Sequence, residues 1–299
     1  MRTSSVMSIM IGTAISDGIS MLGALSVQSW IFNVELQDCV PPMSFLLFQL
    51  CGVTTSIRND VIRCSTWLSV LMALVRYLVL KMSKSPKKTH KISSFLSGIR
   101  MFVVTLGIST MLTLVFHFKM EVFVSGEWSP AAYCSDQSLP SRPIYGARHT
   151  ELFTSNNAVL LRVFMFFNGA LSKILPCISL PILTILLVRV YRRTQDNRTA
   201  SLVVSTKSTT ERTTGLVIFM TVSFFIALLP TGISTSLQAV CFDPGFRYIG
   251  SHVDHICYTL HTINASLHCF MCFGMSSQYR KTVRTMFHSL KMKKRGSMF

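Results

Sequence analysis

The chain has 299 residues, of which 49% are hydrophobic and only 14% are charged, and its formal net charge is +17. Charged residues make up about a quarter of an ordinary soluble domain, so this composition argues against a soluble core. The positive charge alone would suit a nucleic-acid partner, but the basic residues lie in three short clusters between long apolar runs. We therefore expect an all-α, polytopic membrane helix bundle that has lipid, and no nucleic acid, among its partners.

Six apolar runs are long enough to cross a bilayer, whose core takes about 20 residues of helix. They lie near residues 6–30, 57–81, 95–118, 166–188, 214–237 and 256–275. The first run is too long to be the apolar part of a cleaved signal peptide. No internal repeat or soluble domain interrupts the runs, so residues 1–299 are interpreted as one transmembrane domain.

The distribution of Lys and Arg predicts the orientation of these spans. Segments 81–91 and 189–212 and the tail beyond 279 are basic, whereas 119–157 and 238–254 are balanced or acidic. Because basic segments stay in the cytoplasm, both termini are expected inside the cell, as in a multi-pass protein of the plasma membrane. In the tail, 276–299, apolar residues recur at helical spacing among basic ones, which predicts an amphipathic cytoplasmic helix on the lipid surface.

Asp17 is the only acidic residue deep inside a predicted span. A carboxylate at the bilayer centre costs roughly 2.5–3.5 kcal/mol on insertion scales, so we expect it to face other helices and a polar partner. A functional charge is the default expectation for such a residue. A protonated structural carboxyl is the alternative.

Polar residues at the outer ends of the spans are candidates for ligand contact. Together they would line the outer cavity that a helix bundle presents, although each one could instead be a snorkelling or loop residue. The candidates are Asp60, Arg63, Lys173, Asp254, His255 and His261.

Other local patterns indicate helix kinks and no catalytic chemistry. Pro176, Pro181 and Pro230 fall inside the fourth and fifth predicted spans, where a proline frees a backbone carbonyl and bends the helix. The histidines near Cys257 suggest a metal cluster, but no carboxylate lies deep enough to complete it, and neither a Ser-His-Asp set nor a phosphate loop is visible. We expect no enzyme, no metal and no cofactor.

Several stretches of the chain resemble a known family of receptors. They are RCSTWL at 63–68, ALVRY at 73–77, LPC at 175–177, PILT at 181–184, FFIALLP at 224–230 and MSSQYRK at 275–281. Nearly the whole chain resembles the nematode serpentine receptor class W chemoreceptors, rhodopsin-like seven-helix receptors related to FMRFamide-type neuropeptide receptors. The resemblance implies a G-protein-coupled receptor for an extracellular peptide or small molecule, with a heterotrimeric G protein as its partner.

The resemblance also assigns roles inside the bundle. Asp17 matches the conserved aspartate of the family's second helix, and Asn264 and His268 on the last helix are its family-like partners in an intramembrane polar core. No predicted helix precedes the one that carries Asp17, so the resemblance implies that the first family helix is missing. Pro230 matches the proline of the sixth helix, but the tryptophan usual just before it is absent.

At the cytoplasmic side, Arg76 and Tyr77 match the arginine and tyrosine of the Asp/Glu-Arg-Tyr motif. Val75 replaces the acidic residue, so the resemblance implies a weakened inactive-state lock. The segment 268–272 is a degenerate form of the family's Asn-Pro-x-x-Tyr motif. The residues that the resemblance places at the G-protein contact are Arg76, Tyr77, Arg212, Arg280 and Lys281.

The resemblance further implies a disulfide between Cys51 and Cys134, with Cys39 as the alternative partner. A small polytopic transporter or channel is the competing function for the whole chain. It would predict inverted repeats, broken helices or several charges at the midplane, whereas only Asp17 lies at that depth in the predicted spans.

Overall fold

The computed structural model describes residues 5–35, 41–82, 85–130, 140–196, 207–241, 244–275 and residue 285. Within the helices, the side chains of 25–35, 86, 88, 89, 116, 194–196, 207–220, 244, 247, 251 and 267–275 lie outside this description. The elements in chain order are α1 (Ser5–Glu35), α2 (Phe45–Lys81), α3 (Pro86–Ile92), α4 (Phe95–Phe118), β1 (Met120–Trp128), β2 (Arg142–His149), α5 (Glu151–Gly169), η1 (Ala170–Ile174), α6 (Leu175–Asp196), α7 (Lys207–Val240) and α8 (Pro244–Met275).

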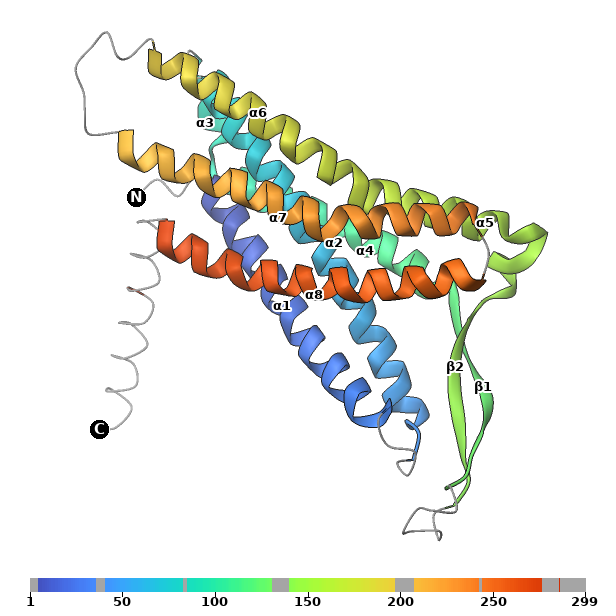
Figure 1. The fold of residues 1–299 in the computed structure, drawn as a ribbon. Coiled ribbons are helices and arrows are strands. Elements are labelled where there is room, and N and C mark those ends of the chain that lie inside the picture. Colours follow the sequence, from blue (N-terminus) through green and yellow to red (C-terminus); the bar gives the residue numbers. More distant parts are fainter. Residues whose placement is uncertain are drawn as a thin grey trace, which may run out of the picture.

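The bundle is built around α2, which packs against α1, α4 and α6. The second set of contacts joins α7 to α8, α5 and α6. Figure 1 shows α1 and α2 running at an angle to α7 and α8, so that the two sets cross. The apolar core lies where α1, α2, α6 and α7 meet and includes Leu68, Val75, Phe224 and Leu228.

The first helix, α1, turns its polar residues inward and its large apolar residues outward. The large apolar side chains of Ile11, Ile15, Ile19 and Leu22 are between 41% and 69% exposed. Contact with lipid stabilises such a surface, whereas contact with water is unfavourable. Small polar residues at helix contacts let membrane helices approach closely and hydrogen-bond. Among the described side chains of α1, the buried polar ones are Ser5, Ser8, Thr13, Ser16, Asp17 and Ser20.

The spanning helices other than α4 extend beyond the predicted runs. Helix α4 coincides with the predicted run at 95–118, whereas α2 starts twelve residues before the predicted 57, because Ser44 caps it by accepting a hydrogen bond from the Leu47 N–H. Five helical segments in the described part of the chain are long and apolar enough to cross a membrane. They are Ser5–Ala24, Phe45–Lys81, Phe95–Val115, Glu151–Arg193 and Thr221–Val240. The sixth predicted span, 256–275, lies in α8 and is not among these five.

The predicted fourth span, 166–188, lies within a longer helical run made of α5, η1 and α6, in which α5 has a kink at residues 155–158 where the backbone is not helical. Pro176 cannot donate a backbone hydrogen bond and would clash with the carbonyl one turn before it. The helix widens at this point into the π-helical η1, in which the Leu175 N–H bonds to the Ala170 carbonyl five residues back. Pro181 and Pro230 lie inside α6 and α7, at the positions predicted for helix bends.

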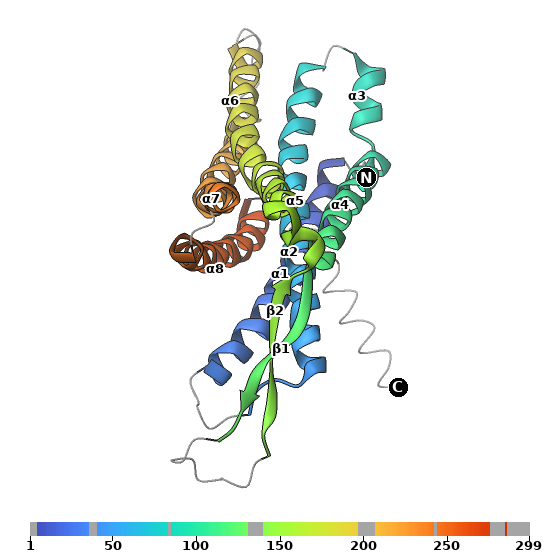
Figure 2. The same ribbon diagram turned by 90° about the vertical axis from the view of Figure 1, so that its right-hand side faces the viewer.

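A β-hairpin interrupts the otherwise helical fold, and the sequence analysis did not predict it. β1 pairs antiparallel with β2 from Met120 opposite His149 to Trp128 opposite Arg142. Figures 1 and 2 show this ribbon projecting from one end of the bundle. The turn from α2 to α3 lies at the other end, near the end of α6. The basic segment 81–91 and the basic end of α6 therefore share the end opposite the hairpin.

Candidate functional site

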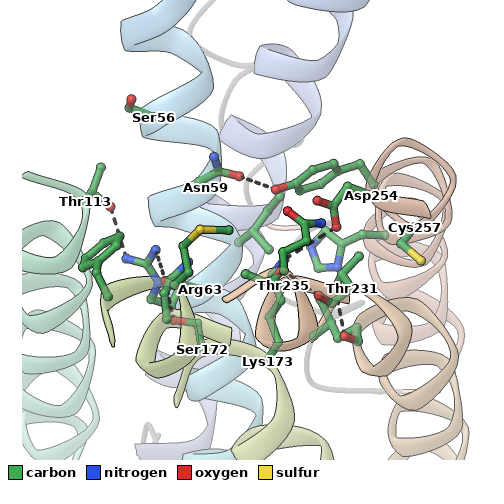
Figure 3. A pocket seen from close by; sticks show the side chains of 18 of the residues that line it. Ser56, Asn59, Arg63, Thr113, Ser172, Lys173, Thr231, Thr235, Asp254 and Cys257 are labelled. Carbon is green, nitrogen blue, oxygen red and sulfur yellow. Dashed lines mark hydrogen bonds and ion pairs between the residues drawn. The ribbon is translucent and has the colours of Figure 1, made fainter. Parts of the chain in front are cut away.

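A cavity of about 300 Å³ opens between α2, α5, η1, α7 and α8. Its walls come from the halves of these helices that lie toward the hairpin, and Figure 3 shows their polar side chains converging. The volume is at the lower end of the roughly 300–1,000 Å³ usual for ligand pockets. The main polar lining residues are Asn59, Arg63, Lys119, His149, Asn168, Ser172, Lys173, Thr235, Gln238, Asp254, Tyr258 and His261.

Arg63 forms one wall of the cavity and joins three helices. Its Nη1 donates to the Ser109 carbonyl at 2.9 Å and to Thr113 Oγ1 at 3.2 Å on α4. Its Nη2 donates to Asn168 Oδ1 on α5 at 3.3 Å. Asn168 Oδ1 also accepts from Ser172 at 3.1 Å, so η1 is tied to the same network.

Lys173 and Asp254 face each other on the opposite wall. Their charged atoms, Nζ and Oδ1, are 4.0 Å apart, and Lys173 Nζ also donates to Thr235 Oγ1 on α7 at 3.1 Å. The ring of Tyr258 lies 5.9 Å from the same nitrogen. The Tyr258 hydroxyl donates to Asn59 Oδ1 on α2 at 3.0 Å. This wall therefore connects η1, α7, α8 and α2.

His261 lies at the inner side of the cavity, one turn along α8 from Cys257. It is 2% exposed, and its ring centroid is 6.2 Å from that of Phe224 in the core. Neither ring nitrogen has a hydrogen-bond partner among the described residues. A buried imidazole normally finds such partners, so these two nitrogens are available to a polar group inside the cavity.

Lys119 reaches the cavity from the junction of α4 and the hairpin. It is 5% exposed, and its Nζ lies 5.5 Å from the centroid of the Phe164 ring. Burial lowers the pKa of Lys119 to about 8, because a low-dielectric surround disfavours the charged form. At pH 7, below this pKa, the amine is still mostly protonated and therefore positively charged.

The cavity brings together four of the six ligand candidates named from the sequence. Arg63, Lys173, Asp254 and His261 line it. Asp60 and His255 are not among the lining residues: Asp60 is buried against α4, where its Oδ2 accepts from Thr110, and His255 is exposed. Asp60 follows the lining residue Asn59 on α2, and His255 follows the lining residue Asp254 on α8. One residue turns the side chain by about 100° around the helix axis, so Asp60 and His255 point away from the cavity.

Several lining residues escaped the sequence analysis. Asn59 and Asn168 are polar residues inside or beside apolar runs, and this pattern is the signal that could have identified them. Lys119 falls in the segment 119–157, for which the sequence predicted only an extramembrane connection, and the hairpin, which was not predicted, carries His149 to the cavity.

Asp17 lies deeper in the bundle and has a partner that the sequence analysis did not name. It is 3% exposed, and its Oδ1 accepts a hydrogen bond of 2.6 Å from Ser65 on α2. Asn264, one of the two predicted partners, is also buried. The side chain of His268, the other one, lies outside the described residues, so the predicted polar core of these residues stays a prediction.

The cytoplasmic candidates are described only in part. Arg76 and Tyr77 are half-buried near the end of α2 that leads to α3, and Lys81 Nζ lies 5.5 Å from the Tyr77 ring centroid. The side chain of Arg212 and all of Arg280 and Lys281 lie outside the described residues. The grouping of these residues at a G-protein contact stays a prediction.

The predicted disulfide also stays a prediction. Cys51 is half-buried on α2 and carries a free thiol, while Cys134 and Cys39 lie outside the described residues. The tail 276–299 also lies outside them except for residue 285.

Comparison with known proteins identifies one related family. A family model described as "Serpentine type 7TM GPCR chemoreceptor Srw" matches residues 1–289. No curated protein matches the chain. The match confirms the family resemblance seen in the sequence, whereas the relation to FMRFamide-type receptors and the missing first helix stay predictions.

Proposed function

The chain belongs to the Srw family of serpentine seven-helix G-protein-coupled chemoreceptors, and on this premise we propose that it detects an extracellular peptide or small chemical signal and activates a heterotrimeric G protein. As a member of this family it is a multi-pass integral protein of the plasma membrane. The observation that carries the proposal is the polar cavity at the hairpin end of the bundle. That end lies opposite the basic segments expected in the cytoplasm.

The cavity is placed so that a ligand can change the packing of α7. Lys173 and Thr235 join η1 to α7 beside the cavity. Farther toward the basic end, the Thr184 and Thr221 hydroxyls are 2.9 Å apart and join α6 to α7. A ligand that binds better to one packing of these helices shifts the population toward it, and the change reaches the cytoplasmic end through rigid helices.

The proposed cytoplasmic contact is formed by Arg76 and Tyr77 with Arg212, Arg280 and Lys281. Two kinds of observation support it: the family membership, and the position of Arg76 and Tyr77 near the inner end of the central helix. A basic surface at this end suits contact with a protein that binds at the lipid surface.

The test is a signalling assay on variants matched for surface level. Cells that express the chain are screened against peptides and small metabolites with a G-protein dissociation sensor. We expect Arg76→Ala to abolish the response to any agonist found. Arg100→Ala is the control, because Arg100 is exposed on α4 near the same end. An undiminished response of Arg76→Ala contradicts the assignment, and ligand-evoked uptake or current without G-protein activation supports the transporter or channel instead.

A further inference from the structure

The charges that line the cavity are unbalanced. Arg63, Lys119 and Lys173 contribute three cations, and Asp254 is the single carboxylate among the described lining residues. Excess charge in a low-dielectric site raises the free energy of the empty protein unless a counter-charge enters. The sign of this excess therefore predicts the sign of the ligand.

Arg63 is held in the cavity wall by hydrogen bonds to uncharged groups. All three hydrogen-bond partners of its terminal nitrogens are uncharged oxygens, and its Nε has no partner among the described residues. Asp60 lies one turn away on the same helix, but its Oδ2 accepts from Thr110 on α4 and it does not line the cavity. The guanidinium thus reaches the cavity without a carboxylate hydrogen-bonded to it, and an oxyanion is its preferred partner.

The opposite wall leaves room for a second polar contact. Lys173 and Asp254 are 4.0 Å apart, longer than a hydrogen bond, and both nitrogens of His261 are without partners in the described part of the chain. A neutral imidazole can donate from one nitrogen and accept at the other. His261 can therefore bind a neutral polar group of a ligand whose charge is held at Arg63.

We propose that the cavity binds a small organic carboxylate, with its anionic oxygens at Arg63 and its polar or apolar body directed toward His261. This inference rests on the proposed receptor function and specifies the ligand class. A small acid and the free C-terminus of a peptide supply the same group, and the binding experiment below separates these two sources.

The first test needs no ligand. Asn168→Asp keeps the shape of the side chain and turns an oxygen that already accepts from Arg63 into a carboxylate oxygen. We expect the melting temperature of the purified full chain in detergent to rise by roughly 2–4 °C, the shift expected for a modest stabilisation of a chain this long. Asn59→Asp is the control, since Asn59 lines the same cavity but accepts from a neutral tyrosine hydroxyl. A rise for Asn59→Asp alone, or an unchanged or lower melting temperature for Asn168→Asp, overturns the proposal.

The second test measures binding directly, by the same melting experiment. The probes are straight-chain acids from acetate to octanoate with their methyl esters and the corresponding amines, and short peptides with a free or an amidated C-terminus. We expect only free carboxylates to raise the melting temperature. The arm that responds, acids or peptides, shows the source of the carboxylate.

Variants connect this effect to Arg63. Arg63→Gln and Asn168→Asp are both expected to abolish the carboxylate effect, the second in a protein that is at least as stable as the wild type. Arg58→Gln is the control, because Arg58 is equally buried on α2 but does not line the cavity. Stabilisation by the amines or esters, or by no carboxylate in the panel, overturns the proposal.

The two proposals fail separately. Carboxylate binding without G-protein activation contradicts the receptor function and leaves the ligand class standing. A cationic agonist that activates the G protein through this cavity contradicts the ligand class and leaves the receptor function standing.

Discussion

Ser65 donates a hydrogen bond of 2.6 Å to Asp17 and thereby ties the central helix α2 to α1 in the middle of the bundle. Both side chains are almost completely buried. A buried carboxylate is tolerated only when hydrogen bonds replace its lost hydration.

We therefore expect Ser65→Ala to lower the free energy of unfolding by about 1–3 kcal/mol, the usual cost of leaving a buried polar group unsatisfied. Thermal unfolding of the purified chain measures this loss. Ser69→Ala is the matched control, since the Ser69 hydroxyl donates to the Ser65 carbonyl of its own helix. If the two variants lose equal free energy of unfolding, the hydrogen bond to Asp17 contributes no more to stability than the bond that Ser69 makes.

Gly98 lies where α4 touches the start of α1, and it leaves no room for a side chain. A Cβ atom there would lie 2.5 Å from the Ser5 carbonyl oxygen and even closer to the Ser8 hydroxyl. We expect Gly98→Ala to destabilise the bundle by about 1–3 kcal/mol, as overpacking does, and to reduce the amount of protein at the cell surface. Gly107→Ala on the same helix meets nothing within 4 Å, so its better helix propensity should leave stability equal or higher. The prediction fails if both variants reach the surface equally well.

Asp254 is the one acid among the described cavity residues, and it opposes a carboxylate ligand. Asp254→Asn removes this repulsion. It also removes the ion pair with Lys173, whose Nζ lies 4.0 Å from Asp254 Oδ1. We expect free-acid probes to bind roughly three- to tenfold more tightly, a gain of up to about 1.4 kcal/mol, as measured by the probe concentration at half-maximal thermal shift. Glu151→Gln makes the same charge change at an exposed site, where solvent screens it, and should have no effect. Weaker binding to Asp254→Asn would contradict an anionic ligand.

Cys51 is predicted to pair with Cys134 or, alternatively, with Cys39 when the protein folds in an oxidising compartment. The hairpin lies near the start of α2, where the rings of Phe45 and Tyr145 are 5.4 Å apart. Mass spectrometry of non-reduced peptides from surface-delivered protein identifies the partner. We expect a Cys51–Cys134 peptide and reduced surface delivery for Cys51→Ser, with Cys241→Ser as the control because Cys241 is exposed at the end of α7. Recovery of Cys134 as a free thiol would contradict the pairing.

The membrane class could be predicted from the sequence, and the apolar run at 95–118 coincides with helix α4. A helix such as α4, apolar over its whole length, has to satisfy all its backbone groups internally when it crosses lipid, so its limits at 95–118 followed from the apolar run alone. The hairpin was missed because its strands have half-buried and exposed residues but no buried face, and pairing between strands that are distant in the sequence depends on contacts that no local pattern records.

Composition and charge distribution by themselves determined that the chain is a membrane bundle, and family-like motifs indicated its receptor class. Only the tertiary structure decided which polar residues meet. Arg63 and Asp60 are both charged residues of α2, three positions apart, yet one lines the cavity and the other packs against α4. Each residue of a helix is turned about 100° from the one before it, since a turn takes 3.6 residues. The rotation of α2 about its axis is set by its packing against α1, α4 and α6 together, and this rotation cannot be determined from α2 alone.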